Sequence, residues 1–225
     1  MPPHVFVTGT DTEVGKTVVA AGLLSLWRER YKTLYWKPIQ TGTSVDRDAA
    51  SVKRLACAAP DEIADEIYCY PEPLSPHLVA RMHKRPISLD VLREKCDELK
   101  RRAERLIVEG AGGLLVPVTE TETMVDLVKA LNIPVLIVSR AGLGTINHTV
   151  LTLRAARECG ISVWGVVMCG GENSQNAEAI EQYGGAKVLA QIPRIEDLEK
   201  NLARVFRENF SEPQEGEKTV DAPRS

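Results

Sequence analysis

The amino-acid sequence predicts an α/β fold, in which a parallel sheet carries helices on both of its faces. Short apolar runs, typical of buried strands, alternate along the chain with amphipathic stretches that have the period of a helix. Strands that are apolar on both sides indicate a sheet covered on both faces, and the alternation favours a parallel order. A length of 225 residues favours one large domain.

The predicted elements follow one another in chain order. Six apolar runs predict the strands: VFV from Val5, LYW from Leu34, LIV from Leu106, VLIV from Val135, VWGVVM from Val163 and KVLAQI from Lys187. Helices are predicted for VVAAGLLSLW, from about Ala49, over residues 89–103, for INHTVLTLRAA and over residues 198–210. We expect residues 1–210 to form the domain and the polar residues 211–225 to be a disordered tail.

Composition and charge exclude several classes of protein. The chain is 44% hydrophobic and 26% charged, as a soluble globular domain should be. A net charge of −3 and a pI near 5.9 speak against a nucleic-acid partner. The start lacks the features of a signal peptide, and no apolar run reaches the roughly 18 residues of a membrane span. The five cysteines form no CxxC pair, which indicates reduced thiols and predicts a cytoplasmic protein.

A glycine-containing loop between the first strand and the first helix predicts a phosphate site. In the sequence GTDTEVGKT, Gly15, Lys16 and Thr17 lead into the helix. In such a P-loop, backbone N–H groups and the positive helix end bind phosphates, the lysine meets the outer phosphates, and the hydroxyl holds Mg²⁺. The spacing departs from the usual pattern, because Thr10 occupies the first glycine position and Gly9 precedes it. A plain strand-to-helix turn is the alternative, but it leaves Lys16 opposed to the helix dipole.

Two carboxylates are candidate ligands of the metal. Mg²⁺ takes oxygen ligands and usually binds one or two carboxylates beside the phosphates. Glu109 ends a buried strand, and the glycines that follow in EGAGG let the backbone approach a ligand closely. A structural ion pair is the alternative for Glu109. Asp48 would either bind the metal or cap the helix near Ala49, and Asp46 competes for both roles.

A second lysine is expected at the same edge of the sheet. Lys37 follows the strand LYW and precedes Pro38, which ends the strand. Two ammonium groups that face one site imply a strongly anionic reaction centre. The alternative is a lysine that extends its charge to solvent from a strand end. Thr41 lies four residues further on and could hydrogen-bond a polar substrate.

Taken together, these motifs resemble the dethiobiotin synthetase family of the biotin pathway. The matching segments are VTGTDTEVGKT, KPIQTG, SPH from Ser75, VEGAGGLLVPV, GLGTINH and IPR, which run from Val7 to about Arg194. The resemblance implies a P-loop α/β homodimer that uses ATP and Mg²⁺. It further implies insertion of CO₂ between the two amines of 7,8-diaminopelargonate to close a ureido ring.

The resemblance also assigns residues. Lys16 and Lys37 would be the catalytic groups, Lys16 on the outer phosphates and Lys37 on the carbamate and the transferred phosphoryl group. The metal ligands would be Thr17, Asp48 and Glu109. The nucleotide would contact Glu13, Val14, Gly15, Lys16, Thr17, Val18, Asp48, Glu109, Gly110, Ala111, Gly112, Cys169, Gly170, Pro193, Arg194 and Ile195. The diamine would contact Thr12, Glu13, Lys37 and Thr41, and its carboxylate would reach Gly144, Thr145 and Asn147 of the other subunit, where a helix begins.

One position departs from the family's pattern, and two other functions share the fold. Many family members carry a base-reading asparagine where this chain has Cys169, and a thiol is a poor partner for adenine, so strict ATP selectivity is in doubt. A partition-type ATPase switch would carry a further lysine early in the loop, where Thr10 and Asp11 stand. The ATP-binding half of a cobyrinate amidase-like enzyme would need a glutaminase domain, for which no chain remains.

Overall fold

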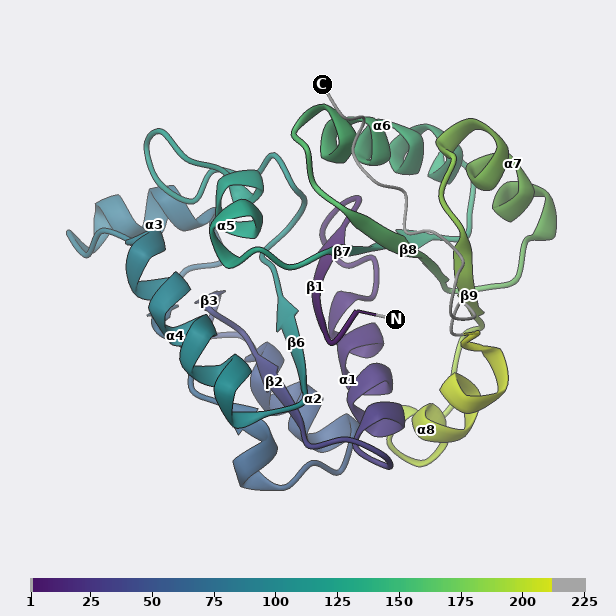
Figure 1. Ribbon diagram of the computed structural model, residues 1–225, viewed down its shortest axis with the longest axis horizontal. Helices are drawn as coiled ribbons and strands as arrows, with labels where there is room; N and C mark the ends of the chain where they lie inside the picture. Colours follow the sequence, from purple (N-terminus) through teal and green to yellow (C-terminus); the bar gives the residue numbers. More distant parts are fainter. Residues whose placement is uncertain (1, 212–225) are drawn as a thin grey trace.

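A seven-stranded sheet, parallel throughout, forms the centre of the computed structural model (Figure 1). The structure describes residues 2–211, so the predicted tail lies outside the described residues except for Ser211. In spatial order the strands are β4 (Ile63–Ala64), β2 (Thr33–Trp36), β6 (Arg105–Glu109), β1 (His4–Gly9), β7 (Val135–Arg140), β8 (Val163–Cys169) and β9 (Val188–Ile192). A second, two-stranded parallel sheet pairs β3 (Ile39–Thr41) with β5 (Tyr68–Tyr70).

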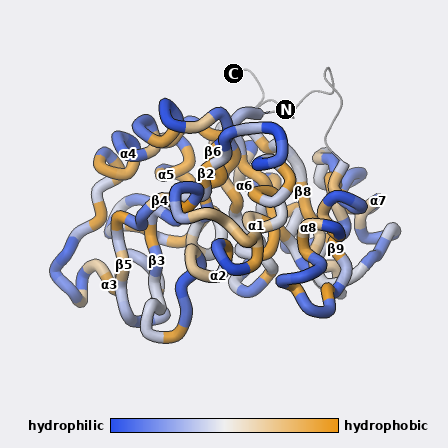
Figure 2. The backbone as a smooth tube through the Cα atoms, turned by 90° about the horizontal axis from the view of Figure 1, so that it is seen from below, coloured by the Kyte–Doolittle hydropathy of each residue, from blue (hydrophilic) through white to orange (hydrophobic). Residues whose placement is uncertain are grey.

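Helices cover both faces of the large sheet, as the sequence predicts. One face packs against α1 (Lys16–Trp27), α2 (Asp48–Leu55) and α8 (Leu198–Asn209). The other packs against α3 (Pro76–Met82), α4 (Leu89–Arg102), α5 (Met124–Leu131), α6 (Thr145–Glu158) and α7 (Ser174–Gly184). In Figure 2 the strongly hydrophilic segments lie on outward-facing parts such as α7. The single α/β domain predicted from the sequence is therefore confirmed.

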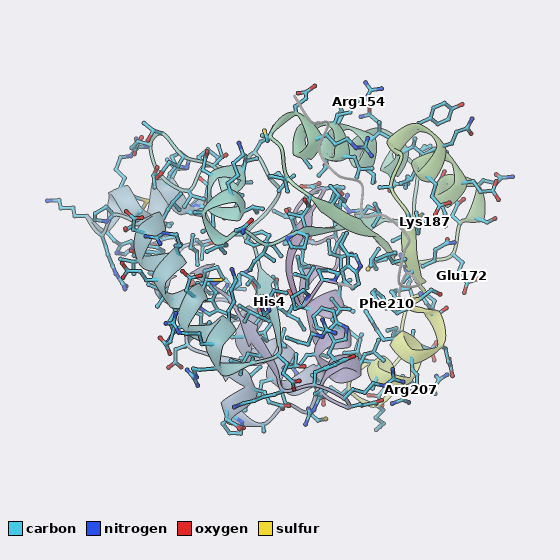
Figure 3. The ribbon with its side chains drawn as sticks, in the orientation of Figure 1. His4, Arg154, Glu172, Lys187, Arg207 and Phe210 are labelled. Atoms are coloured by element: carbon cyan, nitrogen blue, oxygen red, sulfur yellow. The ribbon has the colours of Figure 1, made fainter. Side chains whose placement is uncertain are left out.

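The two faces have separate hydrophobic cores because side chains alternate along each strand. In β1, Phe6 belongs to one core, whereas Val5 and Val7 belong to the other. The last described residues close the second core, since the Phe210 ring lies 5.7 Å from the ring of Trp164 in β8 (Figure 3). No helix in the described part of the chain is long and apolar enough to span a membrane.

All of the predicted strands and helices are present, and several further elements were not predicted. The six predicted strands are β1, β2, β6, β7, β8 and β9, and the five predicted helices are α1, α2, α4, α6 and α8. The sequence analysis missed β3, β4 and β5, which have two or three residues each, too few to show an alternation. It also missed the one-turn η1 (Pro60–Glu62) and the helices α3, α5 and α7.

The carboxyl ends of the parallel strands meet at one edge of the sheet, where ligands of such sheets bind. Gly9 ends β1, Lys37 follows β2, Glu109 ends β6 and Cys169 ends β8. The predicted site residues therefore come from neighbouring strand ends.

Candidate nucleotide and metal site

The loop after β1 has a shape that depends on its glycines. A Cβ at Gly9 would lie 2.6 Å from the carbonyl oxygen of Asp11, so no larger residue fits this turn. Gly15 has a left-handed conformation, with φ of 103°, at the start of α1. The Lys16 Nζ donates a hydrogen bond to the Asp11 carbonyl across the loop, at 3.2 Å. The loop thus curls around its own lysine, as a phosphate-binding loop does.

Arg140, which lies outside the loop, holds the loop in place through hydrogen bonds to two of its residues. Arg140, the last residue of β7, donates from Nη2 to Asp11 Oδ2 and to the carbonyl of Thr12, both at 3.3 Å. Asp11 Oδ1 in turn accepts the Thr12 backbone N–H at 2.7 Å. The sequence analysis did not single out Arg140, although a charged residue at a buried strand's carboxyl end was a usable signal.

The register of β2 and β6 brings Lys37 to Glu109. Tyr35 pairs with Ile107 and Trp36 with Val108, so the next position sets Lys37 beside Glu109. The Lys37 Nζ lies 3.3 Å from Glu109 Oε1 and donates to the Gly110 carbonyl at 2.9 Å. It also lies 2.5 Å from Asp48 Oδ2. Lys37 is buried rather than extended to solvent, which removes the alternative considered for it.

Three oxygen donors meet beside the start of α1, and the Thr17 hydroxyl lies at a distance from each carboxylate that suits adjacent ligands of an octahedral metal. Thr17 Oγ1 lies 3.1 Å from Asp48 Oδ1 and 3.0 Å from Glu109 Oε1. Adjacent oxygens around Mg²⁺, with bonds of about 2.05 Å at right angles, lie about 2.9 Å apart. The hard oxygen donors and their spacing both fit Mg²⁺. No group of three or more His, Cys, Asp or Glu side chains within residues 2–211 is placed to hold a metal alone. Phosphate oxygens and water would therefore have to complete the set of ligands.

The structure separates the roles of the two competing aspartates. Asp46 Oδ2 accepts from the Ser51 hydroxyl at 3.1 Å, and Asp46 Oδ1 accepts from the Arg47 N–H. Asp46 thus supports the first turn of α2 from outside the helix. Asp48 is the first residue of α2, and its carboxylate is turned to Lys37 and Thr17 instead of capping the helix. The capping role considered for Asp48 is therefore wrong. The N-cap position belongs to Arg47, whose side chain makes no capping hydrogen bond, and Gln40 Oε1 accepts the Asp48 N–H.

Burial and charge oppose each other in this cluster. Burial disfavours the charged form of Lys37, but Glu109 and Asp48 outweigh it and raise the pKa of the ammonium. Burial raises the pKa of Glu109 against the attraction of Lys37. Burial also works against ionised Asp48, yet Lys37 and Thr17 bring the pKa of that carboxyl below its usual value. Burial, reinforced by Lys37, lowers the pKa of Lys16.

These groups surround a cavity of about 380 Å³. Its walls hold both lysines, the three candidate metal ligands and several of the other predicted contacts, with one residue, Gln40, that was not predicted. The lining residues are Thr12, Glu13, Gly15, Lys16, Thr17, Val18, Lys37, Gln40, Thr41, Asp48, Glu109, Ala111 and Gly112.

Other predicted residues lie outside this cavity. Cys169 packs beneath the loop, where its Sγ would lie 3.1 Å from a Cβ on Gly15, and burial raises the pKa of its thiol to about 12. Gly170 follows it and donates its N–H to the Ile192 carbonyl at 2.9 Å. Pro193, Arg194 and Ile195 continue from that strand end. A third group, Gly144, Thr145 and Asn147, stands at the start of α6, where Asn147 is exposed and Thr145 is buried against Thr149.

Two residues that support the carboxylates were not predicted. Tyr35 donates its hydroxyl hydrogen to Glu109 Oε2 at 2.9 Å. Gln40 accepts the Asp48 backbone N–H on Oε1 at 2.9 Å. The signal for Tyr35 was present in the sequence, because side chains two positions apart on a strand share a face, and Tyr35 stands two residues before Lys37.

The loop, the buried lysines and the oxygen cluster define a P-loop nucleotide-binding protein, and comparisons with known proteins agree. A chain of the MinC:MinD cell division protein complex of Aquifex aeolicus has a TM-score of 0.58 over 90% of this chain and 86% of that one, at 14% identity. A ParA family ATPase from Chlorobium tepidum has a TM-score of 0.55 at 13% identity, over 90% and 88% of the two chains. These likenesses show the fold alone.

Sequence relatives identify the family within that class. A family described as an AAA domain matches residues 3–201. The ATP-dependent dethiobiotin synthetase of Paramagnetospirillum magneticum is 48% identical over 84% of this chain and 86% of its own length. The enzyme of the same name from Lawsonia intracellularis is 40% identical over 88% and 92% of the two chains. The chain belongs to the dethiobiotin synthetase family of ATP-dependent ligases.

Proposed function

We propose that this protein closes the ureido ring of dethiobiotin from 7,8-diaminopelargonate, CO₂ and ATP, with release of ADP and phosphate. The observation that carries the proposal is the placement of Lys16 and Lys37 in the walls of one cavity, beside two carboxylates and a hydroxyl. A site with two buried ammonium groups suits a reaction in which negative charge accumulates on phosphoryl and carbamate oxygens. Family membership supports the identity of the substrates.

The reaction requires three bond-forming steps. One amine of the substrate attacks CO₂ and loses a proton to give a carbamate. A carbamate oxygen attacks the γ-phosphorus of ATP, ADP leaves, and a carbamic–phosphoric anhydride remains. The second amine attacks the carbamate carbon, loses a proton and expels phosphate, which closes the ring. None of these steps needs a covalent bond to the protein, and positioning with positive charge is how phosphoryl transfer is generally catalysed.

The two lysines have different roles in this proposal. Lys16 stands in the first turn of α1 and would contact the outer phosphates of the nucleotide. Lys37 stands at the opposite wall, next to Asp48 and Glu109, and would steady the carbamate and the phosphoryl group in flight. Its raised pKa keeps the ammonium charged, which both tasks require.

Thr17, Asp48 and Glu109 would hold Mg²⁺ in the filled site. When bound, Mg²⁺ would neutralise charge on the phosphate oxygens during transfer. Lys37 contacts the same two carboxylates, so a bound metal would share them with its ammonium.

The remaining assignments complete the proposed site. Glu13, Val14, Gly15, Val18, Gly110, Ala111 and Gly112 would contact the nucleotide phosphates and sugar, and Cys169, Gly170, Pro193, Arg194 and Ile195 would lie at the base. Thr12, Glu13 and Thr41 would contact the diamine. We place the enzyme in the cytoplasm, as a homodimer in which Gly144, Thr145 and Asn147 of one subunit bind the substrate carboxylate held by the other.

One assay tests the proposed reaction. Purified protein is mixed with the diamine, bicarbonate and MgATP, and phosphate release is measured with and without the diamine. We expect phosphate release to depend on the diamine and to match dethiobiotin formed, because the nucleophile is the substrate's own carbamate. Rapid ATP hydrolysis without the diamine would favour an ATPase switch and contradict the proposal.

The shared site has its own test. Asn147 is exposed on one subunit, so its loss should leave the fold intact. We expect Asn147→Ala to raise the KM of the diamine and to leave ATP affinity unchanged. A monomer that is fully active in sedimentation at assay concentration would contradict the dimer.

A further inference from the structure

Tyr35 contacts the candidate metal ligand Glu109 from behind. Its hydroxyl lies 2.9 Å from Glu109 Oε2, and the hydrogen bond joins two side chains that are at most 1% exposed. Tyr35 is not among the described residues that line the cavity, whereas Glu109 is. The phenol of Tyr35 therefore stands on the far side of the Glu109 carboxylate from the cavity.

The two oxygens of Glu109 have different partners. Oε1 accepts from the Thr17 hydroxyl at 3.0 Å and lies 3.3 Å from the Lys37 ammonium, so it faces the cluster at the start of α1. Oε2 accepts from Tyr35. With Oε2 held by a buried hydroxyl, the carboxylate cannot rotate freely, and Oε1 is the oxygen presented to the site.

The strand positions explain why Tyr35 can do this. Tyr35 in β2 and Lys37 just after it lie on the same face of the sheet. The parallel register sets Tyr35 beside Ile107, two residues before Glu109. The ring is packed in the same core as Ile107 and the inner side of α1, so its hydroxyl is fixed in place. A fixed donor loses little entropy when it holds a carboxylate in one orientation.

We propose that Tyr35 is a positioning residue that holds Glu109 so that Oε1 alone binds the metal of the metal–nucleotide complex. The inference rests on the proposed function, because it takes Mg²⁺ and ATP as the ligands of this cavity. Partners that orient a metal-binding carboxylate from behind change metal affinity by about 10- to 100-fold when they are removed. Tyr35 therefore tunes metal binding although it touches neither metal nor nucleotide.

The test is direct binding of Mn²⁺, a paramagnetic substitute for Mg²⁺. Free Mn²⁺ is measured by electron paramagnetic resonance during titration of the protein with a non-hydrolysable ATP analogue present. We expect Tyr35→Phe to weaken Mn²⁺ binding about tenfold or more. Binding of the analogue alone, measured by calorimetry in the presence of a chelator, should stay at the wild-type value.

Tyr70→Phe is the matched control. Tyr70 is also a buried tyrosine, and its hydroxyl donates to the Arg85 carbonyl at 2.7 Å, in a different part of the fold. Tyr70→Phe loses the same atom and one hydrogen bond donated by the hydroxyl, so it reports the general effect on folding. Melting curves in chelator show whether each variant is folded. We expect Tyr70→Phe to bind Mn²⁺ within about twofold of wild type.

A second measurement distinguishes a positioning role of Tyr35 from a general effect of Tyr35 on packing. If Tyr35 acts through Glu109, its loss should have no further effect on Mn²⁺ binding when Glu109→Gln is already present. Equal Mn²⁺ affinity of Tyr35→Phe and Tyr70→Phe, or a full tenfold effect in the Glu109→Gln background, would overturn the inference alone. Absence of Mn²⁺ binding by the wild-type protein with the analogue would overturn the proposed function, and this inference with it.

Discussion

The buried Lys37 ammonium lies 2.5 Å from the half-buried Asp48 carboxylate, and this ion pair occupies the wall of the cavity where a metal would bind. The same ammonium lies 3.3 Å from Glu109. Lys37 thus supplies positive charge that stabilises the ionised forms of the buried Glu109 and the half-buried Asp48, which would otherwise be costly. Lys37 therefore has a structural role in this cluster as well as its proposed role in the reaction.

Replacing each lysine separately should distinguish binding from chemistry. We expect Lys16→Ala and Lys37→Ala each to lower dethiobiotin formation by about 10³-fold or more, as loss of a cationic phosphoryl clamp does. Lys16→Ala should also weaken nucleotide binding, because the Lys16 side chain stands in the phosphate loop. Lys37→Ala should bind nucleotide nearly as wild type. Calorimetry with an ATP analogue and a product assay check both, and near-normal turnover of Lys37→Ala would remove Lys37 from the mechanism.

The neighbouring aspartates form a natural pair for a second test. Asp48 contacts Thr17 and Lys37 in the cavity, whereas Asp46 accepts from Ser51 outside it. We expect Asp48→Asn to raise the Mg²⁺ concentration needed for half-maximal activity by about tenfold or more, since a neutral amide is a weaker ligand. Asp46→Asn should leave that concentration unchanged and lower only the melting temperature, by about a few degrees, because it weakens the hydrogen bond with Ser51. The hypothesis fails if the two variants need the same Mg²⁺.

The strand ends of this site could be predicted from the sequence because they combine an apolar run with a charge. Lys37 and Glu109 each follow several buried residues, and the physics of a parallel sheet brings such positions to one edge. Asp48 was ambiguous because capping and metal binding use the same side chain, and only the contacts of its carboxylate with Thr17 and Lys37 separate the two roles.

Other features depend on contacts that a sequence does not encode locally. The bond from Tyr35 to Glu109 spans 74 positions and depends on the register of β2 against β6. The contact of Cys169 with Gly15 depends on how closely β8 approaches the loop. The short strands β3, β4 and β5 have too few residues for a recognisable period, and tertiary pairing alone defines them.

The stability of the fold should depend on pH through His4 at the start of β1 (Figure 3). Burial lowers the pKa of His4, and the nearby Lys100 and Arg105 lower it further. Its Nδ1 is buried without a hydrogen-bond partner in the described part of the chain. The folded state therefore disfavours the protonated ring more than the unfolded state does. The contribution of the neutral His4 ring to the free energy of unfolding is fully present above the unfolded pKa of about 6.5. It is lost as the pH falls through the lower folded pKa.

Substitution of His4 should remove this pH dependence. We expect His4→Gln to lose less free energy of unfolding than wild type between pH 7.5 and pH 5, because glutamine does not titrate. His148→Gln, at an exposed position on α6, serves as the control and should follow the wild-type profile. Urea unfolding at several pH values gives the measurement. Parallel profiles for wild type and His4→Gln would show that other groups carry the dependence.

The protein should discriminate only weakly between nucleotide bases if Cys169 stands at the base-binding position. A thiol offers adenine neither a good donor nor a good acceptor, and burial keeps this thiol protonated by raising its pKa to about 12. The phosphates and metal offer the same contacts for every nucleoside triphosphate. We therefore expect GTP or CTP to support product formation within about tenfold of ATP, a difference of about 1.4 kcal/mol or less.

Substitution of Cys169 tests which group reads the base. Cys169→Asn should widen the preference for ATP, since an amide both donates and accepts, whereas Cys169→Ala adds no polar group beside Gly15 and serves as the control. Competition between four triphosphates in the product assay measures the preference. The alternative is that backbone groups near Gly170, Pro193 and Arg194 already read adenine. A wild-type preference for ATP above about a hundredfold, near 2.7 kcal/mol, would favour that alternative and leave Cys169 without a role in selectivity.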